Sequence, residues 1–150
     1  MIVPAFLAIF LFAVAPSVAQ NQDQDGLKEL TEAEFALNVG KFDRAIQLLT
    51  TVISKKPNEA GLYLARAMAY SKKGDYDKSI QDLKQVTQMK SPEAVLEAYN
   101  VLGRIYEIKK DYASAQKAYQ EALTRAKDPA SKRALEQLIE EAGARLKKPK

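Results

Sequence analysis

The side chains of this chain that could act as acids, bases or nucleophiles are mainly carboxylates and lysines. Its 150 residues include no cysteine, histidine or tryptophan. This excludes thiol nucleophiles, thiolate metal sites, disulfides and an imidazole that moves protons near neutral pH. Glu34 and Glu107 are the carboxylates we consider for acid–base work. Helix surfaces carry many unpaired carboxylates by chance, so we predict a protein that is not an enzyme and binds no metal or cofactor.

Basic and acidic residues are mixed along the chain. Lys and Arg number 23 and Asp and Glu 19, which gives a formal charge of +4. A nucleic-acid-binding surface would need clustered positive charge, and only the end of the chain, "RLKKPK", clusters it. We therefore predict no nucleic-acid partner and a solvated tail at 148–150.

The N-terminal segment differs from the rest of the chain. "MIVPAFLAIFLFAVAPSVAQ" has no charged side chain, and Ala5–Ala15 is apolar throughout. Small residues follow at Ser17 and Ala19, where a signal peptidase reads the chain. This pattern predicts a secretory signal peptide at 1–19, a polar linker at 20–25, and an exported protein, periplasmic or secreted.

The alternative is an uncleaved anchor, with the rest of the protein outside the cytoplasm. A membrane-spanning helix needs about 20 apolar residues. The apolar run here is shorter and is bracketed by Pro4 and Pro16. We therefore favour cleavage and expect no stable membrane insertion afterwards.

Three segments of the chain resemble one another: "VGKFDRAIQLLTTVISKKP", "KGDYDKSIQDLKQVTQMKSP" and "KKDYASAQKAYQEALTRAKDP". Gly40 and Gly74 are 34 residues apart, and Tyr76 and Tyr112 are 36 apart. A period near 34 is the length of a two-helix unit. Apolar residues within the units follow helical spacing, as at Ala45, Leu48, Leu49, Val52 and Ile53. We therefore expect an all-α protein.

Particular residues define the turns and the helix contacts. Lys110 replaces the turn glycine, and this predicts either a strain of about 1 kcal/mol in that turn or a different turn geometry. Small residues are expected where the two helices of a unit cross: Ala33, Ala67 and Gly103 on the first helix, and Ala45, Ser79 and Ala115 on the second. A buried Ser79 hydroxyl needs a partner, and we expect it to bond a carbonyl one turn earlier.

These units resemble the tetratricopeptide repeat (TPR) family over about residues 26–129. The third unit matches best, with Tyr99, Leu102-Gly103, Tyr106, Tyr112, Ala115, Tyr119 and Ala122. The resemblance implies an α-α superhelix, a right-handed TPR solenoid of three helix-turn-helix repeats at 26–59, 60–93 and 96–129. A stripe of Ala134, Leu135, Leu138, Ile139 and Ala142 predicts a C-terminal capping helix over 130–147.

In this family the first helices of the repeats line a concave surface. The inward positions that we select as a binding groove are Glu34, Asn38, Leu64, Met68, Lys72, Asn100, Arg104, Glu107 and Ile108. Leu27, Leu30 and Leu37 are expected to be buried instead, as the apolar stripe of an edge helix. Some family members clamp terminal carboxylates with Lys, Asn and Arg. Here the equivalent positions hold Leu30, Glu34, Ala65, Glu97 and Val101, so that clamp is absent.

The resemblance implies a non-enzymatic adaptor that binds a protein or peptide on its concave face, within an envelope or secreted assembly. The alternative that we keep is a self-assembling oligomer formed through the capping helix or the edge helix.

Overall fold

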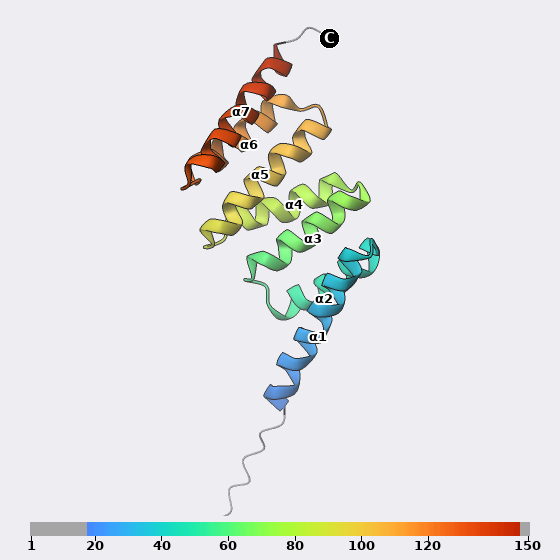
Figure 1. Ribbon diagram of the computed structural model, residues 1–150. Helices are drawn as coiled ribbons and strands as arrows, with labels where there is room; N and C mark the ends of the chain where they lie inside the picture. The colour runs from blue at the N-terminus through green and yellow to red at the C-terminus, as the bar shows by residue number, and fades with distance from the viewer. Residues whose placement is uncertain (1–17, 148–150) are drawn as a thin grey trace, which may run out of the picture.

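Seven helices make up the part of the chain that the computed structural model describes, residues 18–147, and no strand occurs there (Figure 1). They are α1 (Val18–Asn38), α2 (Phe42–Lys55), α3 (Ala60–Lys73), α4 (Tyr76–Thr87), α5 (Pro92–Ile108), α6 (Tyr112–Leu123) and α7 (Pro129–Leu146). They stack in chain order, with α1 at one end and α7 at the other. The predicted all-α repeat fold is confirmed.

The N-terminal predictions are largely outside this range. Most of the predicted signal peptide, 1–19, lies outside the described residues and stays a prediction. Residues 20–25 form part of the first turns of α1, although we had expected a linker there. Between residues 18 and 147, no helix has the length and apolar character needed to cross a membrane.

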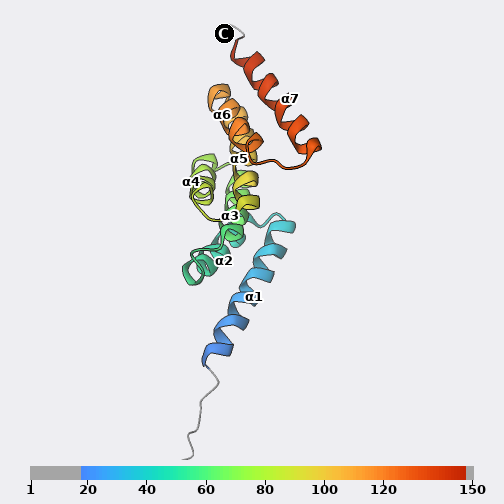
Figure 2. The same ribbon diagram turned by 90° about the vertical axis from the view of Figure 1, so that its left-hand side faces the viewer.

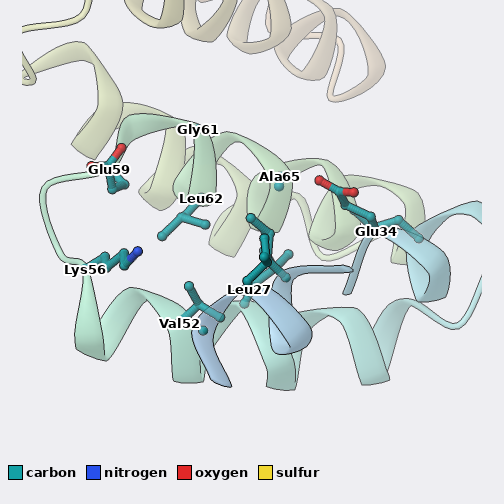
Figure 3. Close-up of a pocket in the computed structure, with 12 residues that line it drawn as sticks. Leu27, Glu34, Val52, Lys56, Glu59, Gly61, Leu62 and Ala65 are labelled. Atoms are coloured by element: carbon teal, nitrogen blue, oxygen red, sulfur yellow. The ribbon is translucent and has the colours of Figure 1, made fainter. Parts of the chain in front are cut away.

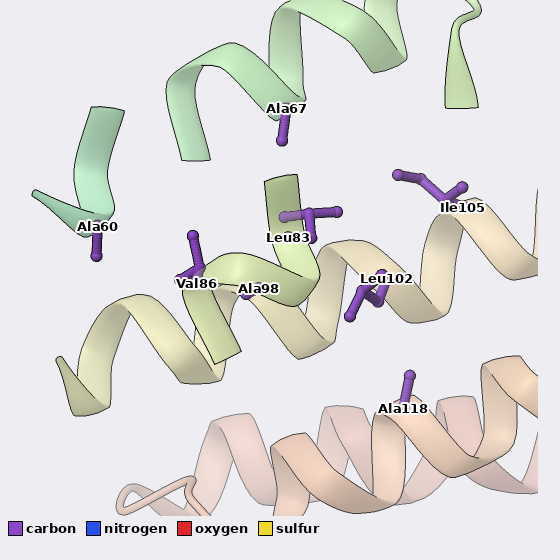
Figure 4. Close-up of a cluster of buried hydrophobic side chains, with 8 residues drawn as sticks. All are labelled: Ala60, Ala67, Leu83, Val86, Ala98, Leu102, Ile105 and Ala118. Atoms are coloured by element: carbon purple, nitrogen blue, oxygen red, sulfur yellow. The ribbon is translucent and has the colours of Figure 1, made fainter. Parts of the chain in front are cut away.

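Each helix buries the face that its apolar spacing defines. On α2 the buried residues are Ala45, Leu48, Leu49, Val52 and Ile53, as predicted. The largest cluster joins α3, α4, α5 and α6. Figure 4 shows Leu83 of α4 in the space between Ala67 of α3 and the α5 residues Leu102 and Ile105. The core is therefore continuous between the second and third repeats.

The predicted small residues lie at the helix contacts, and all are buried. Ser79 is fully buried, but its partner differs from our expectation. Its Oγ donates to the carbonyl of Ala67 on the preceding helix, at 2.7 Å. Because the two helices come close together at these small residues, that carbonyl is within reach of the hydroxyl. The hydrogen bond therefore ties α3 to α4.

A charged pair is buried in the second repeat. Arg66 donates through Nε and Nη2 to the two oxygens of Asp82, both at 2.8 Å, and through Nη1 to Thr50 Oγ1 at 3.0 Å. The hydrogen bonds from Arg66 to Asp82 raise the pKa of Arg66 above its usual value, so the guanidinium stays charged. This pair links α2, α3 and α4.

Helix α7 covers the last repeat, as predicted for a capping helix. Leu135 and Ala142 are buried against α6, and Leu138 and Ile139 are half-buried. Ala134, which we assigned to the same stripe, is exposed instead. It precedes Leu135 by one residue and so lies about 100° around the helix, at the edge of the buried face.

Lys110 adopts the strained backbone that its position predicts. Its φ is 59°, in the left-handed region that Gly40 and Gly74 occupy in the other repeats. The turn is otherwise the same: Asp111 N donates to Tyr106 O at 2.8 Å, as Asp75 N donates to Tyr70 O at 2.9 Å. A side chain at this φ costs about 1–2 kcal/mol, which the turn geometry imposes on the lysine.

Replacing Lys110 with glycine should therefore stabilise the protein. We expect the free energy of unfolding to rise by about 0.5–1 kcal/mol, because the relieved strain exceeds the entropy that glycine loses on folding. Urea unfolding followed by circular dichroism measures it. The reciprocal change, Gly74→Lys, should lower stability by a similar amount. A Lys110→Gly variant that is less stable than the wild type would show that the backbone at Lys110 is not strained.

Candidate functional site

The helices are arranged in two layers. Figure 2 shows α2, α4 and α6 along one side of the stack, with α1, α5 and α7 toward the other. The first helix of each repeat carries the residues that we selected as a groove. Five of the nine line one of two separate cavities, one between α3 and α5 and one between α1 and α3.

The cavity between α3 and α5 has a volume of about 390 Å³ and brings four predicted residues together. These are Met68, Lys72, Arg104 and Ile108, with the remainder of its lining supplied by Ser71, Tyr76, Glu97, Val101 and Ile105. Met68 and Ile108 are 50% and 56% exposed, although both are large and apolar. Apolar surface of this kind, held open beside polar groups, is typical of a binding site.

Two cations that border this cavity form no ion pair among the described residues. Neither Lys72 nor Arg104 takes part in an ion pair or a side-chain hydrogen bond there, whereas Lys73 and Lys109 pair with Asp43 and Asp77 of the preceding repeats. Arg104 also lies close enough to Tyr119 to influence its pKa. Glu97, across the cavity, is likewise unpaired. An incoming carboxylate could therefore bind Lys72 or Arg104 without displacing an internal partner.

Leu64 and Glu107 have structural contacts instead. Leu64 is half-buried and packs against the core cluster, because α3 contacts α5 as well as α4. Glu107 Oε2 accepts the Tyr119 hydroxyl at 3.0 Å, and its Oε1 accepts from Arg145 at 3.2 Å. Burial and this contact with Glu107 raise the pKa of Tyr119. These contacts hold Glu107 toward α6 and α7.

Asn38 and Asn100 complete the predicted set. Asn38 is exposed at the last residue of α1, and Asn100 is half-buried on α5. Neither lines the cavity between α3 and α5 or the one between α1 and α3. Both remain predictions as groove residues.

The cavity between α1 and α3 is larger, about 770 Å³, and it contains the last predicted residue, Glu34. Figure 3 shows Val52 of α2 and Leu62 of α3 pointing toward one another across it. Lys56 and Glu59 lie at one end and Glu34 at the other. The space stays open because α1 packs mainly on α2, and because α3 presents Gly61 and Ala65 to it.

We did not predict this apolar cavity. Leu27, Leu30 and Leu37 were expected to be the buried stripe of an edge helix, and all three line the cavity. Leu30 and Leu37 are half-buried, but Leu27 is 65% exposed. The sequence feature that could have indicated the cavity is the pair Gly61 and Ala65, because these two small residues leave little side-chain volume on α3 to fill the space.

The two carboxylates considered for acid–base work lie apart. Glu34 and Glu107 lie on different helices, α1 and α5, and Glu107 is engaged with Tyr119 and Arg145. No group of three or more Asp or Glu side chains is placed to hold a metal ion within residues 26–147.

The comparisons with known proteins agree with the resemblance seen in the sequence. Residues 58–128 match the model of the tetratricopeptide repeat family. The stacked two-helix units of the structure are consistent with this match.

Solved structures of this family have the same fold. The TPR2B domain of yeast Sti1 superposes with a TM-score of 0.70 at 23% identity, covering 81% of this chain and 98% of that one. The Sgt2 TPR domain from Aspergillus fumigatus superposes with a TM-score of 0.66 at 27% identity, covering 84% of this chain and 86% of that one. PcrH, in complex with the chaperone binding region of PopD, superposes with a TM-score of 0.68 at 18% identity, covering 82% of this chain and 95% of that one.

Proposed function

We propose that the protein is an exported, non-enzymatic adaptor that binds an acidic segment of a partner protein in the cavity between α3 and α5. The observation that carries the proposal is that Lys72 and Arg104, which form no ion pair, lie beside the exposed apolar side chains of Met68 and Ile108. Glu97 lines the same cavity, so its lining has two positive charges and one negative charge. The predicted signal peptide supports export into an envelope or secreted assembly.

The known structures support a polypeptide ligand. The Sti1 domain was solved in a complex with pHsp70, and PcrH with the chaperone binding region of PopD. Both have the fold of this chain and both bind a polypeptide. The arrangement of charge in this cavity then favours a segment that carries carboxylates next to an apolar residue.

The charge preference can be tested with labelled peptides of equal length, each with two leucines in an aspartate-rich, serine-rich or lysine-rich background. Fluorescence anisotropy should give a dissociation constant for the acidic peptide at least about ten-fold lower than for the neutral one. The variant Lys72→Glu/Arg104→Glu should lose this preference, because it places two negative charges at the cavity.

A matched control separates the cavity from net charge. Lys84→Glu/Lys117→Glu changes the charge equally, at exposed positions on α4 and α6, and should bind the acidic peptide like the wild type. If both double variants bind it equally well, the cavity is not the binding site.

The apolar contribution needs variants that leave the core intact. Met68→Asn and Ile108→Asn suit this purpose, since both side chains are largely exposed and the substitutions leave the net charge unchanged. Leu64 is not suitable, because it packs against the core. We expect the Met68→Asn/Ile108→Asn protein to unfold at the wild-type temperature and to bind the acidic peptide at least about ten-fold more weakly.

A further inference from the structure

The outer face of α1 is exposed and apolar at its centre. We define this outer α1 face as Leu27, Lys28, Thr31, Glu32 and Phe35, which line one shallow surface. Leu27 and Phe35 are 65% and 62% exposed. Leu27 and Phe35 lie about two turns apart on the same side of α1, with Thr31 between them. Large exposed apolar side chains on one helix face favour a contact with another helix.

The other repeats show what such a face requires. The positions equivalent to Phe35 are Ala69 and Ile105, and those equivalent to Lys28 are Leu62 and Ala98. All four are buried, because the preceding helix, α2 or α4, packs over them. Within the described residues, Leu27 and Phe35 of the outer α1 face are left largely exposed, and Arg44 of α2 contacts the face at Glu32. This face is the open end of the stack.

We propose that a second copy of this chain covers the outer α1 face, with the two α1 helices antiparallel about a twofold axis near Thr31. Leu27 and Phe35 are each four residues from Thr31, about 6 Å along the helix axis. An axis at Thr31 therefore places Leu27 of each copy against Phe35 of the other. The stripe is complementary to itself, as a closed two-fold contact requires.

The polar groups of the face agree with this arrangement. The Thr31 hydroxyl already donates to the carbonyl of Leu27 at 2.9 Å, so it can be covered without losing a hydrogen bond. Lys28 has no partner among the described residues. Arg44 occupies only Oε1 of Glu32. In the antiparallel pair, Lys28 comes within reach of Glu32 of the second copy, twice per dimer.

The opposite end of the stack does not fit the outer α1 face. The surface that α7 leaves uncovered carries Arg133, Glu136 and Glu140, all exposed. A head-to-tail contact would bury these charges against Leu27 and Phe35, at a high cost in desolvation. The closed dimer is therefore favoured over a filament.

The absence of cysteine allows a direct test by disulfide formation in the full chain. A single Thr31→Cys substitution places one thiol at the twofold axis. Mild oxidation should give at least about ten-fold more covalent dimer than Thr51→Cys, because only the first pair is held together. Thr51 is a matched control: it is exposed and bonds the carbonyl four residues earlier, as Thr31 does.

A mixing experiment tests the register. Leu27→Cys mixed with Phe35→Cys should give mainly the mixed dimer, and each variant alone should give little covalent dimer. Equal yields from Thr31→Cys and Thr51→Cys would overturn the proposal, and so would a mixture that gives no excess of mixed dimer.

Phe35→Asp provides an independent measurement by light scattering with size exclusion. The variant should weaken dimerisation at least about ten-fold while its thermal unfolding stays unchanged, since the side chain is largely exposed. If the Phe35→Asp protein dimerises like the wild type, the contact lies elsewhere, for example in the apolar segment 5–15, and the proposal is wrong.

Discussion

Replacing Gly103 with alanine is expected to lower the free energy of unfolding by about 2 kcal/mol, although alanine is the better helix former. A Cβ at this position would lie 2.3 Å from Cε1 and 2.6 Å from Cδ1 of Tyr119. The Tyr119 ring is fully buried, and its hydroxyl is held by Glu107, so the ring cannot move aside. Thermal unfolding followed by circular dichroism should show a Tm lower by about 5–10 °C.

The other repeats identify the compensating change. At the positions of Gly103 and Tyr119, the second repeat has Ala67 and Leu83, and both are fully buried. A smaller side chain on one helix accommodates the larger one on the other. The double variant Gly103→Ala/Tyr119→Leu should therefore recover part of the loss, with a coupling energy of at least about 1 kcal/mol in a double-mutant cycle.

Gly61→Ala is the matched control. Gly61 is also helical, but a Cβ there meets no atom within 4 Å. This variant should gain up to about 1 kcal/mol from helix propensity alone. If Gly103→Ala is also as stable as the wild type or more so, the close packing of Tyr119 on this backbone is not a constraint.

The pattern of the sequence was sufficient to predict the repeats and their small-residue contacts. Both follow from residue spacing along the chain, which does not depend on how individual side chains pack. Lys110 was predictable in the same way, because two glycines occupy its position in the other repeats and the turn geometry is shared. The packing of Leu64 against the core could not be predicted, because contact between α3 and α5 depends on how closely two repeats approach. Its place in the groove stays a prediction.

The polar contacts were harder to predict. The partner of Ser79 lies on another helix, and only the crossing geometry selects it. The Arg66–Asp82 pair joins residues 16 apart in a chain that is 28% charged. Sequence spacing alone does not distinguish this pair from exposed ion pairs. Alignment of the repeats does distinguish it, because the third repeat has the apolar residues Leu102 and Ala118 at the positions of Arg66 and Asp82.

The exposure of the candidate site was likewise a result of three-dimensional packing. Met68 and Ile108 are apolar and follow helical spacing, so a buried role would have suited the sequence equally well. The structure leaves them open because Leu62, Ala67 and Ala69 already fill the packing face of α3. The absence of ion pairs at Lys72 and Arg104 depends on the positions of neighbouring acids, which the sequence does not give.

Truncating Asp82 to alanine is expected to lower the free energy of unfolding by about 3 kcal/mol. The Arg66 and Asp82 side chains are only 16% and 8% exposed. Removing the carboxylate leaves the guanidinium with Thr50 as its remaining hydrogen-bond partner, and water reaches it poorly. Urea unfolding measures the change. Asp77→Ala is the control: its ion pair with Lys109 is exposed, and we expect a loss below about 0.5 kcal/mol.

Replacing both members of the buried pair should have a much smaller effect than truncating one. Arg66→Leu/Asp82→Ala gives the second repeat the residues that the third repeat already has, Leu102 and Ala118, and both of those are buried. Because both charged groups are removed, no charge is left without a counter-ion in the packed interior, and the leucine adds apolar contacts. We expect the double variant to be within about 1 kcal/mol of the wild type. A double variant as unstable as Asp82→Ala would mean that the hydrogen bonds of Arg66 themselves hold α2, α3 and α4 together.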